Sequence, residues 1–154
     1  TIRRPGKIAA QKTKNQKSKK NACTKLSKQI NPLEEWVDIQ ALKGDPFVVL
    51  GDFNRRFEVE DSKSYGENQG IWQALDDPDS QNTNENLTRI NDDLTPKCWG
   101  GKYGNYIDHI IVDPSAKEMV INNSFDELTY AETSYSDNYK KISDHCPISV
   151  SLDF

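Results

Sequence analysis

A short apolar run that ends in a polar motif constrains the fold of this chain more than any other feature. Residues 47–50 (FVVL) are wholly apolar and partly β-branched, which is typical of a strand covered on both faces. The run leads directly into the motif Gly-Asp-Phe-Asn at residues 51–54. Alternate residues of an extended segment share a face, so we expect Asp52 and Asn54 to project together while Phe53 turns into the core.

Two later strands carry polar residues at comparable positions. Residues 106–112 (YIDHIIV) predict a second strand, and the strict alternation of residues 146–152 (CPISVSL) predicts a strand with one buried face. Asp108 lies at the start of the first of these strands, and Asp144 and His145 directly precede the second. Because a rigid sheet holds polar groups in fixed geometry at strand ends, these residues are candidates for one functional site.

The remaining segments predict helices, loops and one further strand. Apolar residues recur at three- and four-residue steps over residues 22–42, which indicates an amphipathic helix that ends at Gly44. Pro32 either begins a second helix there or kinks a single long one. Further predictions are a short helix at 71–75, polar loops at 58–69 and 76–97 (the latter with short strands) and a strand at 125–130. Strands separated by helices and long loops indicate an α/β layered domain.

The charge of the chain is divided unevenly. Residues 1–28 hold ten Lys and Arg and no acid, whereas from Gln29 onward ten bases face all 24 acids, a formal charge of −14. We expect residues 1–21 to form a basic, mobile lead-in or long loop, because they lack large apolar residues and clear periodicity. This lead-in either contacts a phosphate backbone or is a solvated surface segment.

The three cysteines do not form a recognisable metal motif. Cys23, Cys98 and Cys146 include no CxxC pair and no histidine at zinc-finger spacing. Either Cys23 pairs with Cys98, as would suit an exported protein, or all three remain thiols. No apolar run approaches the roughly 18 to 20 residues that cross a bilayer.

The polar motifs contain the residue types that phosphodiester hydrolysis requires. The reaction needs an activated water, donors for the charge that gathers on the phosphorus oxygens, and help for the departing oxygen. A hard divalent cation such as Mg²⁺, held by carboxylates and water, supplies the last two. Taken singly, a Gly-Asp-x-Asn motif is also typical of a β-turn, and an Asp-His pair before a strand is typical of a cap.

Three segments together resemble a known enzyme family. LGDFNRRF, YIDHIIV and KISDHCPISV, in this order over about 100 residues, are similar to the last three motifs of the endonuclease/exonuclease/phosphatase superfamily. A preceding ACTKLSKQINPLEEWVD helix and a CWGGKY segment resemble a bacterial nuclease-like branch of it. The similarity covers residues 22–154, which we interpret as the carboxyl-terminal portion of such a domain, after the lead-in at 1–21.

The resemblance implies a role for each matching residue. Asp52 matches the aspartate that positions or deprotonates the attacking water and lies near the metal, and Asn54 matches the asparagine that contacts the scissile phosphate. Asp144 matches the terminal acid near the metal. His145 matches the histidine that binds the phosphate and stabilises the transition state or transfers a proton, and Asp108 matches the acid that orients this histidine. The implied cofactor is Mg²⁺ or Mn²⁺.

Neighbouring residues have two interpretations each. Arg55, and with it Arg56, either grips substrate phosphate or is a solvated arginine after a strand. Trp99 and Tyr103 either stack on bases or pack in the core or at its rim. His109 alternates away from Asp108 on its strand, so we expect it to be structural.

The amino-terminal motifs of the superfamily are not found in this sequence. They include an asparagine, a metal-binding glutamate, and a further histidine and tyrosine. Glu34 and Glu35 lie on the amphipathic helix and do not replace that glutamate. The resemblance therefore implies one sheet with flanking helices, part of a four-layer α/β/β/α sandwich, with an uncovered inner face and little hydrolytic activity in isolation.

The family resemblance leaves the substrate and the compartment open. It favours DNA or RNA, cut by endo- or exonuclease action. The alternatives are a phosphatase or phospholipid phosphodiesterase of the same superfamily, or a non-catalytic fragment that binds polyanions. Family habit favours a secreted or periplasmic location.

Overall fold

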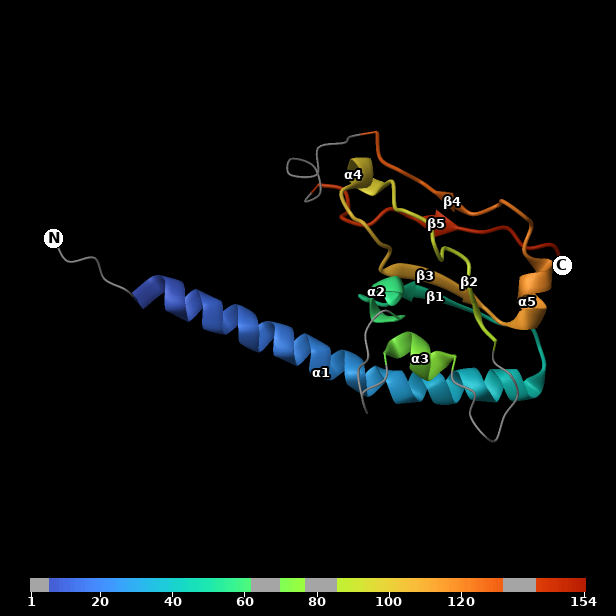
Figure 1. Cartoon of the computed structure of the whole chain (residues 1–154), viewed down its shortest axis with the longest axis horizontal. Coiled ribbons are helices and arrows are strands. Elements are labelled where there is room, and N and C mark those ends of the chain that lie inside the picture. Colours follow the sequence, from blue (N-terminus) through green and yellow to red (C-terminus); the bar gives the residue numbers. More distant parts are fainter. Residues whose placement is uncertain (1–5, 62–69, 77–85, 132–140) are drawn as a thin grey trace.

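The computed structural model shows a mixed α/β fold with two small antiparallel sheets (Figure 1). It describes residues 6–61, 70–76, 86–131 and 141–154, with the backbone alone for 6–23 and for 60–61. In Figure 1 the helices α1 and α3 lie on one side of a three-stranded sheet, and a two-stranded sheet lies on its other side. The predicted α/β class is confirmed at this level.

A single long helix, α1 (Gly6–Lys43), forms the outer layer. It runs through Pro32 without interruption and ends at Gly44, whose positive φ of 74° lets its N–H bond to the Ala41 carbonyl. The prediction of a loop before residue 22 is wrong from Gly6 onward. The segment is rich in Lys, Gln and Ala, which have high intrinsic helix propensity, and this outweighs the lack of an apolar stripe. Among the described helices, none has both the length and the apolar composition needed to cross a membrane.

The three-stranded sheet brings the first two polar motifs together. Its strands are β1 (Val48–Asp52), β2 (Thr88–Arg89) and β3 (Asp108–Val112), in the order β1-β3-β2, and both pairings are antiparallel. The register pairs Val48 with Val112 at one end and Asp52 with Asp108 at the other. The two predicted strands are thus neighbours, and their aspartates lie side by side.

The main core lies between this sheet and the helical layer. Two short helices complete the layer: α2 (Phe57–Asp61) follows the Gly-Asp-Phe-Asn motif within the segment expected to be a loop, and α3 (Ile71–Leu75) lies where it was predicted. The buried members of the core are Val37, Phe53, Phe57, Ile71, Leu75, Leu87 and Ile111. The apolar stripe predicted on the helix supplies Leu26, Ile30 and Leu33 at the margin of this core.

The opposite face of the sheet packs on a second sheet, so the expectation of a single sheet with an uncovered inner face is wrong over this part of it. Strands β4 (Asp126–Glu127) and β5 (Ile148–Ser149) form this antiparallel pair, beside helix α5 (Pro114–Met119). The core here comprises Ile110, Val112 and Ala116, with Val48, Ile90, Val120, Ile148 and Val150 against it. Burial alternates from Cys146 to Leu152, which confirms the predicted one-sided strand pattern, although β5 itself is short.

A disulfide joins a short helix to the segment before β5. Helix α4 (Cys98–Gly101) carries Cys98, which is bonded to Cys146 with a Cα to Cα distance of 5.7 Å. The predicted alternatives, a bond between Cys23 and Cys98 or three free thiols, are both wrong. The two bonded cysteines are 48 residues apart, so their proximity depends on the tertiary fold rather than on sequence spacing.

The expectation that the first strand is covered on both faces is wrong at its carboxyl end. Val48 and Val49 are partly buried, but Leu50 keeps 71% of its surface exposed. Leu50 alternates onto the same face as Val48 and pairs with Ile110, toward the two-stranded sheet. Among the described residues, those of the second sheet and its margin cover Val48 and stop short of Leu50.

Candidate functional site

The ends of two neighbouring strands hold a pair of aspartates. Asp52 is the last residue of β1 and Asp108 the first of β3, and the two are direct partners across the antiparallel ladder. Their side chains are 37% and 27% exposed. Both carboxylates are therefore fixed by backbone pairing and still reach solvent, which is what a ligand-binding acid requires.

The Gly-Asp-Phe-Asn motif folds as a tight turn. Asp52 accepts hydrogen bonds from the Asn54 backbone N–H at 2.8 Å and from Asn54 Nδ2 at 2.9 Å. Asn54 has a φ of +53°, a conformation that asparagine tolerates better than most residues. Phe53 is buried, and its N–H bonds to the Ile107 carbonyl. The prediction that Asp52 and Asn54 project together while Phe53 enters the core is confirmed.

The third motif brings an imidazole between these acids. His145 Nδ1 lies 2.7 Å from Asp108 Oδ2, a hydrogen bond that joins two motifs 37 residues apart. On the other side of the ring, His145 Nε2 lies 3.9 Å from Asp52 Oδ2 and 4.0 Å from Asp144 Oδ1. The structure thus brings together Asp52, Asn54, Asp108, Asp144 and His145, all five of the residues whose roles the resemblance implies.

The surrounding carboxylates alter the protonation of this imidazole. Burial alone lowers the pKa of His145. The hydrogen bond to Asp108 and the negative charges of Asp108, Asp52 and Asp144 together raise the pKa by more than burial lowers it. The net result is a pKa above the ordinary histidine value. At a pH just above the ordinary histidine pKa, a larger fraction of His145 is therefore protonated than of a free imidazole. This positive charge suits contact with a phosphate.

The two arginines after the motif lie differently from one another. Arg55 donates from Nη1 to the Asn54 carbonyl at 3.1 Å, and the Arg55 carbonyl is within 2.8 Å of His109 Nε2. Arg56 is exposed and lines a cavity beside the acids. Sequence alone did not distinguish them, because both simply follow the motif.

A cavity of about 210 Å³ opens next to the His145 side chain. Asp108, Asp144 and His145 line it on one side, and Arg56 and Tyr103 also contribute to its lining. Trp99 is 3% exposed and packs among buried residues, so the packing interpretation holds for Trp99. Tyr103 is partly buried and packs at the margin of the same cluster, which confirms rim packing for Tyr103, and it also lines the cavity.

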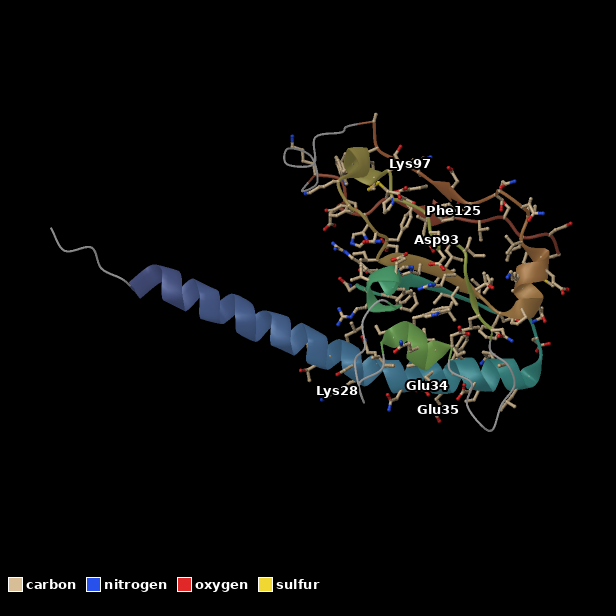
Figure 2. All side chains as sticks on the ribbon, in the orientation of Figure 1. Lys28, Glu34, Glu35, Asp93, Lys97 and Phe125 are labelled. Atoms are coloured by element: carbon tan, nitrogen blue, oxygen red, sulfur yellow. A yellow bond between two sulfur atoms is a disulfide. The ribbon has the colours of Figure 1, made fainter. Side chains whose placement is uncertain are left out.

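The donor atoms at the strand ends fit a hard divalent cation. One ligand atom from each of Asp52, Asp108 and His145 lies within 4.8 Å of the others, and Asp144 flanks the same imidazole. Carboxylate oxygens are the preferred ligands of Mg²⁺ and Mn²⁺, and each carboxylate has lone pairs beyond those used in the hydrogen bonds described. Glu34 and Glu35 lie on α1 in the outer helical layer and do not join this cluster (Figure 2).

The second histidine, His109, is structural, as expected from its strand position. Its side chain is 1% exposed, and its ring stacks on Phe57 with centroids 4.0 Å apart. Burial lowers the pKa of His109, and the hydrogen bond to the Arg55 carbonyl does not fully offset this. The folded protein therefore disfavours the charged form of this ring.

This lowered pKa predicts acid sensitivity of folding. Between the folded pKa and the unfolded value of about 6.5, the unfolded chain binds more protons, so stability falls as pH falls through this range. The contribution of His109 is fully present above about pH 6.5. Urea unfolding at pH 7.5 and pH 5 is expected to show a larger stability loss for wild type than for His109→Gln. Equal losses in the two proteins would contradict this interpretation.

Sequence comparison adds one finding. The profile described as the Endonuclease/Exonuclease/phosphatase family matches residues 26–145. No curated protein and no solved structure matches the chain. The matched residues include Asp52, Asn54, Asp108, Asp144 and His145.

Proposed function

Because the chain belongs to the endonuclease/exonuclease/phosphatase family, we propose that it hydrolyses phosphodiester bonds in nucleic acid with the help of Mg²⁺ or Mn²⁺. Family membership supports a phosphodiesterase-type hydrolase. The observation that carries the proposal is the hydrogen bond between Asp108 and His145, with Asp52 and Asp144 on the other side of the imidazole. Three motifs that are distant in sequence meet in this cluster.

Each residue of the cluster has a task in this proposal. Asp52 orients the attacking water and accepts its proton, a role that suits an exposed carboxylate at a strand end. Asn54 donates from its amide to a phosphate oxygen. His145 donates from Nε2 to the phosphate, where its positive charge offsets the charge that develops in the transition state. Asp108 holds the imidazole by Nδ1, so that Nε2 remains available to the substrate.

Asp52 and Asp144 are the proposed cation ligands. A bound Mg²⁺ or Mn²⁺ supplies Lewis acid stabilisation of the phosphate oxygens and of the leaving oxygen. The two carboxylates lie on the same side of His145, which supports a shared ligand position there. Arg55 and Arg56 are further candidates for phosphate contact, and the cavity favours Arg56 over Arg55.

The cavity and the charge distribution support nucleic acid as the substrate. A volume of about 210 Å³ suits a single sugar or base, and Tyr103 and Arg56 offer an aromatic ring and a cation beside it. The ten bases among residues 1–28 favour a polyanion. A phosphatase or a phospholipid phosphodiesterase remains the alternative within the family, because fold does not determine substrate.

The chain is proposed to be the carboxyl-terminal portion of a four-layer α/β/β/α sandwich of the bacterial nuclease-like branch. The missing amino-terminal motifs support this, and so does the exposed Leu50 on a strand that the pattern predicts to be covered. The disulfide supports export to the periplasm or the medium, where such bonds persist.

Hydrolysis assays of the full-length gene product test the proposal. Mg²⁺-dependent cleavage of DNA or RNA, abolished by EDTA and restored by Mn²⁺, is the expected result. Cleavage of phospholipid instead would favour the alternative substrate class. Binding of polyanions without any hydrolysis would contradict the proposal and favour a non-catalytic module.

The 154-residue chain by itself is expected to show little or no hydrolysis. The cluster described here lacks the glutamate that the family uses as a principal metal ligand. Incubation of residues 1–154 with plasmid DNA and Mg²⁺ measures this directly. Brisk cleavage that is lost in Asp144→Ala would contradict the incomplete-site proposal while supporting the assigned cluster.

A further inference from the structure

Two aromatic side chains donate hydrogen bonds to the backbone of the loop that carries His145. Trp99 Nε1 donates to the Ser143 carbonyl at 3.1 Å, and the Tyr130 hydroxyl donates to the His145 carbonyl at 2.9 Å. The two rings contact each other with centroids 5.0 Å apart. The backbone positions on both sides of Asp144 therefore depend on this aromatic pair.

A covalent bond connects the same loop to a separately anchored segment. Cys146 directly follows His145 and is bonded to Cys98 of α4. Helix α4 is fixed in turn by Glu127, which accepts from the Cys98 N–H at 3.0 Å and from the preceding backbone N–H at 2.8 Å. Cys146, the residue after His145, is thus joined by a disulfide to helix α4, and Glu127 of strand β4 holds the start of this helix in place.

We propose that the Cys98–Cys146 disulfide, with Trp99 and Tyr130, positions His145 against Asp108, and that reduction of this disulfide releases the imidazole. Cys98 and Cys146 are positioning residues, because their side chains act through the backbone of His145. The consequence, a phosphodiesterase that is active when oxidised and weakened when reduced, rests on the proposed function. The positioning of the His145 imidazole by the disulfide does not depend on the proposed function.

The reduction needs a dithiol and a route to the bond. Two electrons and two protons pass from the dithiol to the disulfide, the bond between the two Sγ atoms breaks, two thiols form, and the reagent closes to its own cyclic disulfide. Cys98 and Cys146 are 5% and 6% exposed, and both line the cavity beside His145. A small dithiol can therefore approach from the cavity. Without the covalent bond, the described contacts that hold the loop are non-covalent: the hydrogen bonds from Trp99, Tyr130 and the Leu128 N–H, and the bond between His145 and Asp108.

The two histidines of the chain allow the test to read the imidazole itself. Proton resonances of the His145 and His109 rings are followed by NMR at fixed pH, before and after dithiothreitol, while thiol titration counts the cysteines. The thiol count is expected to rise by two, and the His145 resonances to shift and broaden, while those of His109 stay at their folded positions. This outcome is independent of hydrolytic activity.

Matched variants separate the contribution of the Cys98–Cys146 disulfide from that of the Tyr130 hydroxyl. Cys98→Ser is expected to show the reduced His145 spectrum without dithiothreitol, whereas Cys23→Ser is expected to respond like wild type. Tyr130→Phe removes the hydroxyl donor and is expected to shift the His145 resonances in part. Unchanged His145 resonances when the thiol count rises by two would overturn the proposal. A joint shift of both histidines would also overturn it, because the bond would then support the whole fold.

Discussion

Replacing His145 by alanine in the full-length gene product is expected to lower kcat by about 10²- to 10⁴-fold. The imidazole is proposed to contact the phosphate, and its pKa is raised because Asp108, Asp52 and Asp144 surround it. Its removal takes away a positive donor in the transition state, so kcat falls more than KM rises. Initial rates of DNA hydrolysis at saturating Mg²⁺ measure the change.

Two further variants make this prediction specific. Asp108→Asn keeps the shape of the partner but removes its charge, so a smaller decrease in kcat and a lower pH for the loss of activity are expected. Lys141→Ala changes an exposed side chain on the same segment and is expected to leave kcat unchanged. A His145→Ala protein that folds and retains wild-type kcat would rule out the proposed role of this ring.

Replacing Phe57 by alanine is expected to destabilise the fold by about 3 to 5 kcal/mol. Phe57 is fully buried, stacks on His109, and meets Phe53 edge to face with centroids 5.3 Å apart. The substitution leaves a cavity directly beneath the turn that carries Asp52 and Asn54. Equilibrium unfolding in urea measures the loss in the free energy of unfolding.

The control for this substitution lies at the end of the chain. Phe154 is 98% exposed, so Phe154→Ala removes the same atoms without opening a core and is expected to change stability by less than about 0.5 kcal/mol. Similar losses for the two variants would show that Phe57 is not part of a packed core.

The polar cluster could be predicted from sequence because its members follow strand patterns. The apolar run before Asp52 and the run after Asp108 indicate two strands, and the resemblance implies the partnership between Asp108 and His145. The hydrogen bond between those two residues and the pairing of the strands agree with this expectation. The residue roles themselves stay predictions until they are tested by substitution.

Other features depend on tertiary contacts that sequence patterns do not encode. The partner of Cys98 is 48 residues away, and the contacts of Tyr130 and Trp99 with the backbone of the His145 loop leave no periodic signal. The CWGGKY segment at residues 98–103 resembles the family, but its sequence does not indicate that it supports that loop. The part of the helix before residue 22 has no apolar stripe, so hydrophobic periodicity does not predict it, although intrinsic propensity favours a helix there.

The exposure of Leu50 also has a physical explanation. Its neighbours on the strand are apolar, so the local pattern predicts burial, but burial requires a covering layer that the described residues do not provide. An expectation about a single strand thus fails where the packing partner is absent from the described part of the chain.

Anomalous diffraction from crystals of the full-length gene product grown with Mn²⁺ tests the central claim most directly. The account predicts a manganese peak in contact with the carboxylates of Asp52 and Asp144, next to His145. A well-ordered peak at another place, with Asp52, Asp144 and His145 making no contact with the ion, would contradict it.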